Sequence, residues 1–214
     1  ELISVYDVDF KKSNFIREKY NCNTSESIKE FLNQDLDIVN ICTPNGLHCE
    51  HTIASIKSGK HVLVEKPMAL TSSDCEKMIH ASLQSNKHLF VVKQNRHNPP
   101  VVALKDKIKS NQLGEIYSVV VNCFWNRNEH YYQTSNWKGT QRLDGGTLFT
   151  QFSHFVDILY YLFGNINDFS GKTINANHKG LIEFEDTGYF NFKLENGAIG
   201  SLNYTTSAFE KNME

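Results

Sequence analysis

The sequence predicts an α/β fold, in which a parallel sheet wound with helices precedes an α+β part with an open antiparallel sheet. Short apolar runs alternate with helical patterns from Leu2 to Lys93, which is typical of βαβ units. A long helix with an apolar stripe follows a polar loop in the second half. Period-two alternation then surrounds Glu195-Asn196-Gly197, which indicates a hairpin.

In the first half, strands are expected where apolar runs are bounded by turn residues, and helices where a cap precedes an apolar period. Asp9 is an expected helix N-cap, as is Thr71 or Ser72, and Gly59 is an expected helix stop. The expected strands are 2–6, 38–42, 61–66 and 89–93, and the expected helices are 9–20, 25–33, 48–57 and 72–84.

The second half changes pattern after Asn111. A long strand is expected over 116–125, followed by a polar, aromatic-rich loop and a helix that Gly164 closes. The expected elements are the strand 116–125, the loop 126–144, the helix 146–163 and meander strands over 182–185, 189–192 and 199–202. Two domains follow from this change, a nucleotide-binding domain over 1–97 and an α+β domain over 98–214.

Composition excludes several classes of protein. The 214 residues are 40% hydrophobic and 21% charged with a formal net charge of -2, so neither nucleic acid nor an anionic membrane is an expected partner. No apolar run reaches the length of a membrane helix, and a cytoplasmic location is expected. The five cysteines are scattered and odd in number, which favours reduced thiols. His48, Glu50 and His51 lack zinc-helix spacing, so no metal is expected.

Lys66 is the first candidate catalytic residue. It ends the apolar run that begins at His61, and Pro67 holds it extended at the carboxyl edge of the sheet, where open α/β sheets bind ligands. The alternative is a strand that ends in a solvated Glu-Lys pair.

Asp7 follows the first expected strand directly, where a dinucleotide fold places an acid on the adenosine ribose. A carboxylate at this place favours NAD over NADP, although a turn aspartate is an equal alternative. No G-x-G-x-x-G motif is present, so either the phosphate loop lies before residue 1 or the chain does not bind a dinucleotide. We expect a piece truncated at both ends, because Leu2–Tyr6 resembles a second strand without its first.

Four polar residues share one face of the long helix: Thr150, Gln151, His154 and Asp157. His154 is suited to accepting a hydroxyl proton near neutral pH, and Asp157 is expected to orient it. A partly buried structural histidine is the alternative.

The preceding loop supplies hydrogen-bond donors and flat aromatic faces that suit a sugar or an anionic group. The residues are Arg127, Tyr131, Tyr132, Trp137 and Lys138. A solvated linker or a subunit contact is the alternative interpretation.

Three motifs, in this order, carry a resemblance to a known family: Thr43-Pro44-Asn45 with His48, Glu65-Lys66-Pro67-Met68-Ala69, and Gly145-Gly146 through His154 and Asp157 to Gly164. Together they resemble the glucose-fructose oxidoreductase, inositol dehydrogenase and MocA family. The resemblance implies a Rossmann domain that binds NAD, an open sheet that serves oligomer contacts, and Lys66 with His154 as the catalytic pair. The cofactor contacts it implies are Thr43, Pro44, Asn45, His48, Glu65, Lys66 and Trp137 beside Asp7.

The chain departs from the family in two respects. It is expected to be truncated at both ends, since the glycine loop is absent and the chain stops at Glu214 in what the family implies is mid-sheet. The other departure narrows the resemblance. The family often has an aspartate four residues before the histidine, where this chain has Thr150. A branch that acts on UDP-N-acetylglucosaminuronate also lacks it, and Arg96-His97 and Trp137-Lys138-Gly139 are similar to that branch.

The resemblance implies oxidation of a ring hydroxyl of a sugar or nucleotide sugar, in surface-polysaccharide synthesis, by a homodimer or homotetramer. An NAD-dependent glycosidase and a non-catalytic scaffold on the same fold are the alternatives. The expected substrate contacts are Lys66, Asn95, Arg96, Arg127, Tyr132, Thr150, Gln151 and His154.

Overall fold

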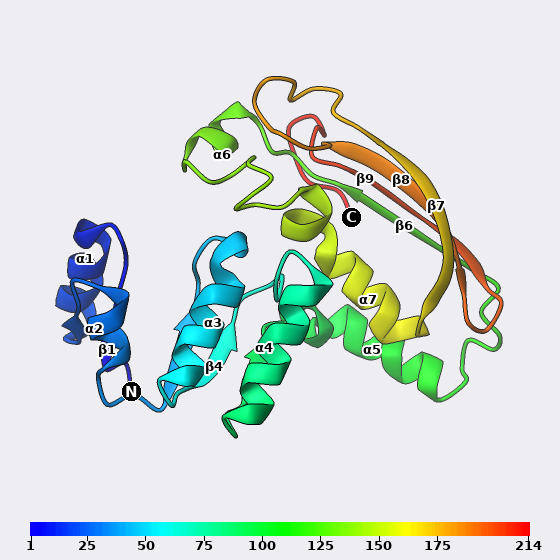
Figure 1. Cartoon of the computed structure of the whole chain (residues 1–214). Helices are drawn as coiled ribbons and strands as arrows, with labels where there is room; N and C mark the ends of the chain where they lie inside the picture. Colours follow the sequence, from blue (N-terminus) through cyan, green and yellow to red (C-terminus); the bar gives the residue numbers. More distant parts are fainter. The chain divides into compact units, whose positions relative to one another are not determined.

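The computed structural model describes all 214 residues, and they form two compact units (Figure 1). Unit 1 comprises Glu1–Cys42, His48–Glu65 and Thr71–Val91. Unit 2 comprises Thr43–Leu47, Lys66–Leu70 and Val92–Glu214. Two short segments that directly follow strands of unit 1 therefore belong to unit 2, and one of them begins with Lys66.

Unit 1 consists of parallel strands linked by helices, as the alternation of apolar runs predicts. Its strands form two sheets rather than one: β1 (Ser4–Val5) pairs with β2 (Asn23–Thr24), and β3 (Ile38–Ile41), β4 (His61–Val64) and β5 (Leu89–Val91) pair in that order. Its helices are α1 (Phe10–Tyr20), α2 (Ile28–Leu32), α3 (His48–Lys57) and α4 (Ser72–Gln84).

Three of the helices of unit 1, α1, α2 and α4, begin at side-chain caps. The Asp9 carboxylate accepts from the backbone N–H of Lys11, and the Thr71 hydroxyl accepts from that of Asp74, which satisfies donors that helix starts leave unpaired. Asn21 ends α1 in the left-handed region with φ 50°. No helix of the chain is both long enough and apolar enough to cross a membrane.

The strand expected to end at Lys66 is shorter than predicted. β4 ends at Val64, and the Glu65 backbone N–H donates to the Ile41 carbonyl. The next peptide bond, Lys66-Pro67, is cis. Lys66 thus lies beyond the strand, in the segment that belongs to unit 2.

Unit 2 contains a four-stranded sheet in the order β6-β9-β8-β7. The sheet is mixed and not purely antiparallel, because β6 and β9 pair in parallel. Its strands are β6 (Ser118–Phe124), β7 (Ile166–Ile174), β8 (Thr187–Leu194) and β9 (Ile199–Thr205), and its helices and helical turns are η1 (Asn45–Leu47), η2 (Gln94–His97), α5 (Pro99–Lys109), α6 (Glu129–Gln133), the π turn η3 (Leu148–Phe152) and α7 (Ser153–Phe163). The strand expected over 182–185 is absent, whereas β7 and α5 were not predicted.

One face of this sheet carries the core of unit 2. Phe152 from η3 and Leu159 from α7 pack with Leu202 and Tyr204 of β9, and all four side chains are buried. Figure 1 shows α7 running along the concave side of the sheet. Burial of these apolar surfaces fixes η3 and the start of α7 against the sheet, and this is where the polar residues of the long helix lie.

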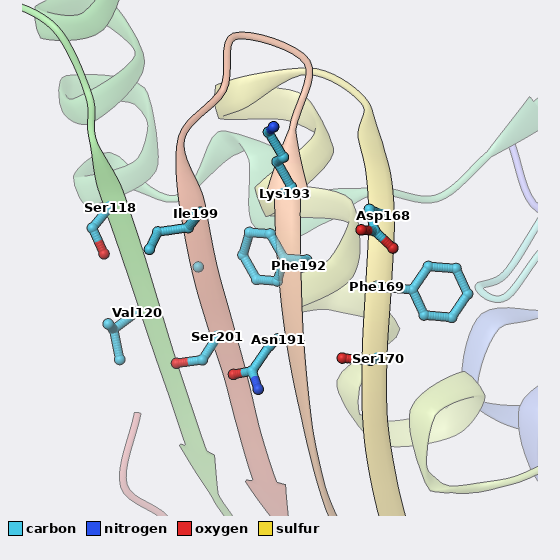
Figure 2. Close-up of a pocket in the computed structure, with 11 residues that line it drawn as sticks. Ser118, Val120, Asp168, Phe169, Ser170, Asn191, Phe192, Lys193, Ile199 and Ser201 are labelled. Carbon is cyan, nitrogen blue, oxygen red and sulfur yellow. The ribbon is translucent and has the colours of Figure 1, made fainter.

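The other face of the sheet is open. A shallow hollow of about 510 Å³ lies on it. Figure 2 shows Val120, Ser201 and Asn191, which line this hollow, on neighbouring strands. Val120 and Ile199 are 63% and 61% exposed. The face therefore presents apolar side chains among polar ones, with the charged Asp168 and Lys193 at the same hollow.

Candidate active site

Lys66 is tied to the turn that precedes the long helix. Its ammonium donates to the backbone carbonyl of Thr150 in η3. The segment that carries it packs closely on the same turn, because a Cβ at Gly145 would lie 2.3 Å from the Leu70 side chain, and Gly145 itself has φ 92°. Only glycine fits this contact without strain.

The segment Thr43–Leu47 meets the same turn. The Gly46 backbone N–H donates to the Leu143 carbonyl at 2.9 Å, and a Cβ on Gly46 would lie 2.2 Å from the Arg142 carbonyl oxygen. Next to it, the buried Asn45 side chain donates to the Asp144 carbonyl at 2.9 Å and to the Thr150 hydroxyl at 2.8 Å.

Asp144 completes this group, which we call the Lys66 cluster: Asn45, Lys66, Asp144 and Thr150. The carboxylate of Asp144 is 1% exposed; it accepts from the Gly139 backbone N–H at 2.7 Å and from the Thr150 hydroxyl. Burial raises the pKa of Asp144, while its bonds to Thr150 and Gly139 and the charge of Lys66 act in the opposite direction.

His154 lies one turn beyond Thr150, at the start of α7. Burial, followed by the charges of Lys66 and Lys93, lowers the pKa of His154 to about 4. The imidazole is therefore neutral at neutral pH, and an accepting nitrogen is available beside a cation. The π turn η3 lies directly before α7 and contains Thr150 and Gln151, and such turns are frequent at functional sites.

Asp157 has a different partner from the one expected. Its carboxylate accepts two bonds from the guanidinium of Arg96, both at 2.7 Å, and lies 3.4 Å from the ammonium of Lys93. Although burial raises the pKa of Asp157, the Arg96 bond and the Lys93 charge hold it below its ordinary value. Asp157 thus forms no hydrogen bond to His154 and acts on it only through its charge.

The same ion pair holds Arg96, which the sequence predicts as a substrate contact. Its guanidinium is held by Asp157 and lies 4.9 Å from the centre of the Tyr161 ring. Arg96 therefore joins η2 to α7, and this bidentate geometry favours a structural role over substrate binding.

A second polar group, which we call the Arg127 cluster, lies next to Thr150 along the chain. The Arg127 guanidinium donates to Gln151 at 3.1 Å and stacks between the rings of Trp125 and Tyr131. The Gln151 amide in turn donates to the Tyr131 hydroxyl at 2.7 Å. A guanidinium held on two aromatic faces keeps its charge in a defined place, which suits recognition of an anion.

Tyr132 does not join this cluster, contrary to the prediction. It is 4% exposed and packs with Ile182 and Phe184, and its ring meets that of His178 edge to face. Burial raises the pKa of Tyr132 to about 12, against its hydrogen bond with Thr206. Adjacent residues on α6 point in different directions, so Tyr131 takes the place expected for Tyr132.

This difference can be measured. We expect Tyr132→Phe to leave the sugar KM unchanged and to lower the free energy of unfolding by about 1 kcal/mol, the value of one hydrogen bond. Tyr131→Phe, the matched variant, should raise the KM about fivefold, because Gln151 loses the hydroxyl that orients it. Initial-rate kinetics and urea unfolding check both. If Tyr132→Phe raised the sugar KM more than Tyr131→Phe, Tyr132 would be assigned to substrate binding as the sequence predicts.

The other predicted residues are distributed over both units. In unit 1, Asp7 is half-buried and accepts from the Asp9 backbone N–H at 2.8 Å, as a turn residue does, and His48 is buried at the start of α3. Glu65 is half-buried beyond β4. In unit 2, Thr43 and Pro44 precede η1, Asn95 lies in η2, and Trp137 is half-buried with its carbonyl accepting from Thr140. No three histidine, cysteine or acidic side chains gather as a metal site.

Two residues of the site were missed from the sequence. Asp144 stands before two glycines, which indicates a turn and gives no sign of its contact with Thr150. Lys93 was predicted only as the end of a strand. Its ammonium forms an ion pair with Asp157, and its charge contributes to the lowered pKa of His154.

The two units and their strand pairing agree with the two-domain family that the motifs predict. Residues 1–93 match the oxidoreductase family GFO_IDH_MocA, described as having an NAD-binding Rossmann fold, and residues 101–213 match the GFO/IDH/MocA C-terminal domain. The chain belongs to the GFO/IDH/MocA family.

Individual relatives agree with this assignment. The chain is 31% identical over 178 residues to scyllo-inositol 2-dehydrogenase (NADP(+)) IolW of Bacillus subtilis, a match that covers 83% of this chain and 48% of IolW. It is 40% identical, with a TM-score of 0.94, to the WlbA dehydrogenase of Chromobacterium violaceum in complex with NADH and UDP-GlcNAcA, covering 99% of this chain and 61% of that one. The WlbA dehydrogenase of Bordetella pertussis, in the same kind of complex, is 34% identical with a TM-score of 0.96, covering 100% and 62%. The chain thus spans 48% of the length of IolW and 61% and 62% of the two WlbA chains.

Proposed function

We propose that the protein is an NAD-dependent dehydrogenase that oxidises a ring hydroxyl of a nucleotide sugar, with UDP-N-acetylglucosaminuronate at C3 as the candidate substrate. The observation that carries this proposal is that the Lys66 ammonium donates to the carbonyl of Thr150, four residues before His154 in the same helical stretch. The Lys66 charge lowers the pKa of His154 further, after burial. The complexes of two WlbA dehydrogenases with NADH and UDP-GlcNAcA support the choice of substrate. A role in surface-polysaccharide synthesis is part of the proposal.

In this proposed reaction His154 and Lys66 have different roles at the sugar hydroxyl. The neutral imidazole of His154 accepts the proton of the sugar hydroxyl, since its lowered pKa keeps it unprotonated. Lys66 donates a hydrogen bond to the same oxygen and stabilises the charge that develops on it. One N–H of Lys66 is already held by the Thr150 carbonyl, which fixes the direction of the ammonium.

NAD would supply the acceptor for the hydride that leaves the carbon bearing this hydroxyl. The residue types fit such a group: Asp7 offers a carboxylate beyond β1 for the ribose hydroxyls, and Asn45 is held rigidly by two hydrogen bonds. We propose Asp7, Thr43, Pro44, Asn45, His48, Glu65 and Trp137 as the residues that hold it.

The Arg127 cluster supports an anionic substrate. The Arg127 guanidinium is held by its hydrogen bond to Gln151, which precedes His154 by less than one helical turn. We propose that this guanidinium binds the carboxylate of the sugar acid, because a planar fork and a carboxylate match in geometry. Gln151 and Thr150 then orient the ring, and Asn95 lines the same site.

Turnover of a defined substrate tests the proposal. The full-length protein is incubated with NAD and UDP-N-acetylglucosaminuronate, and formation of NADH is followed by its absorbance together with the 3-keto product by mass spectrometry. UDP-N-acetylglucosamine, which lacks the carboxylate, is the matched control and should turn over far more slowly. Free sugar released without net NADH would instead favour the glycosidase, and no turnover of any sugar acid would contradict the proposal.

We further propose that a second copy of the chain covers the open face of the sheet. Its exposed apolar residues, Val120, Ile199 and Tyr189, lie on three neighbouring strands among polar side chains. Exposed apolar side chains on one sheet face are typical of an interface, and a symmetric pair is the simplest closed assembly.

A double substitution tests whether two copies associate through this face. Val120→Lys with Ile199→Lys should reduce the mass measured by light scattering to that of one chain, because two buried ammonium groups per copy oppose association. Leu83→Lys is the control, since Leu83 is 76% exposed on α4 of unit 1. An unchanged mass in the double variant contradicts the proposal.

A further inference from the structure

We propose that Asp144 is a positioning residue that sets the place of Lys66 through Thr150, an inference that rests on the proposed function. Asp144 precedes the long helix and was not among the residues that the sequence singled out. It does not touch the reacting atoms in this proposal. Its part is to hold the carbonyl that receives the Lys66 ammonium.

The contacts run in a short chain. Lys66 donates to the backbone carbonyl of Thr150, and the side chain of the same residue is held from two sides. Its hydroxyl donates to the Asp144 carboxylate and accepts from Asn45 at 2.8 Å. Because both the main chain and the side chain of Thr150 are engaged, movement of Asp144 shifts the acceptor of Lys66.

A purely structural carboxylate would not need these contacts. The bond from the Gly139 backbone N–H at 2.7 Å already organises the turn 139–144, as turn aspartates do. The second oxygen of the carboxylate goes instead to Thr150, 6 residues along the chain and within η3. Asp144 is also close enough to Lys66 for the two charges to interact.

Three variants test the inference. Asp144→Asn should reduce kcat about 10- to 100-fold with the sugar KM nearly unchanged, because a small displacement of a catalytic group costs rate more than binding. Thr150→Val should reduce kcat by a similar factor and also raise the sugar KM, since Thr150 is itself a proposed substrate contact. Thr150→Ser keeps the hydroxyl and should restore a kcat near that of the wild type. Rescue by serine but not by valine is a result that simple loss of packing does not give.

A control variant accounts for lost stability. Asp186 is another buried, loop-organising carboxylate, which accepts from the backbone N–H groups of Ala176, Asn177 and His178. Asp186→Asn should lower the melting temperature without a comparable loss of kcat. If Asp144→Asn loses rate only in proportion to stability, as Asp186→Asn does, the inference is overturned.

A readout without turnover keeps the inference separate from the proposed function. The acylation rate of the Lys66 amine by acetic anhydride, measured by peptide mass spectrometry relative to the exposed Lys11, reports its surroundings directly. The acylation rate of Lys66 should rise about threefold or more in Asp144→Asn, which removes a negative charge near the ammonium. It should rise similarly in Thr150→Val, which removes the hydroxyl that holds the Asp144 carboxylate. In Asp186→Asn the rate should stay unchanged. If these acylation rates are found in a protein that oxidises no sugar, the positioning role of Asp144 is supported and the proposed function is contradicted. Unchanged acylation in all variants overturns the positioning role.

Discussion

Lys66→Met is expected to reduce kcat by about 1,000-fold or more, because the ammonium that stabilises charge on the reacting oxygen is lost while the volume of the side chain is kept. NAD binding should change by no more than about twofold, since the lost interaction is made chiefly in the transition state. Stopped-flow or steady-state kinetics give kcat, and calorimetry gives the Kd for NAD.

The control for this result is a lysine of the same chain with no part in the site. Lys107→Met removes an exposed charge from α5 and should leave both kcat and the Kd for NAD unchanged. Retained turnover in Lys66→Met would remove Lys66 from the proposed catalytic pair. Loss of NAD binding together with turnover would assign it to cofactor binding instead.

Local signals predicted the fold of unit 1 well. The caps Asp9 and Thr71 mark helix starts in the structure, because each satisfies backbone donors within its own turn. Long-range pairing was harder to predict. β7 is an edge strand exposed along nearly its whole length, so it shows no apolar alternation, and β6 pairs in parallel with β9, which follows it by 81 residues at Asn122 and Asn203.

The helix α5 was missed although a signal was present. Pro99 and Pro100 open it, and proline is favoured in the first helical turn where its missing donor is not needed. The expected strand 182–185 had alternating residues, but its backbone is used elsewhere: the Glu183 N–H donates to the Gly139 carbonyl. Tertiary contacts with the turn before the long helix override the local pattern there.

At the site, residue types were predictable but their partners were not. The sequence singled out Lys66, His154 and Thr150 by their motifs. It could not show that Asn45, 105 residues before Thr150, donates to its hydroxyl, or that the carboxylate of Asp157 is occupied by Arg96. Such pairings depend on how two distant segments meet, which neither spacing nor periodicity contains.

The titration of His154 gives the second large effect. With a pKa of about 4, the imidazole is neutral above that pH and becomes protonated below it. A protonated imidazole cannot accept the substrate proton, so kcat/KM should be constant near neutral pH and fall as the pH decreases through about 4. His154→Asn should lose about 100- to 10,000-fold in kcat, the range for a general base, and also lose this acid limb.

Lys66 provides an internal check on that titration. Burial is the largest cause of the lowered pKa of His154 and the Lys66 charge is the next, so Lys66→Met should raise the pKa of His154 while leaving it below that of a free histidine. NMR titration of the histidine ring signals, assigned by their loss in His154→Asn, measures it in both proteins without turnover. A pKa near 6.5 in the wild type, or an equal pKa in the two, would show that His154 and Lys66 do not share one site. A rise of the His154 pKa in Lys66→Met shows that the proposed base and the proposed donor lie close enough for their charges to interact, as a shared site requires.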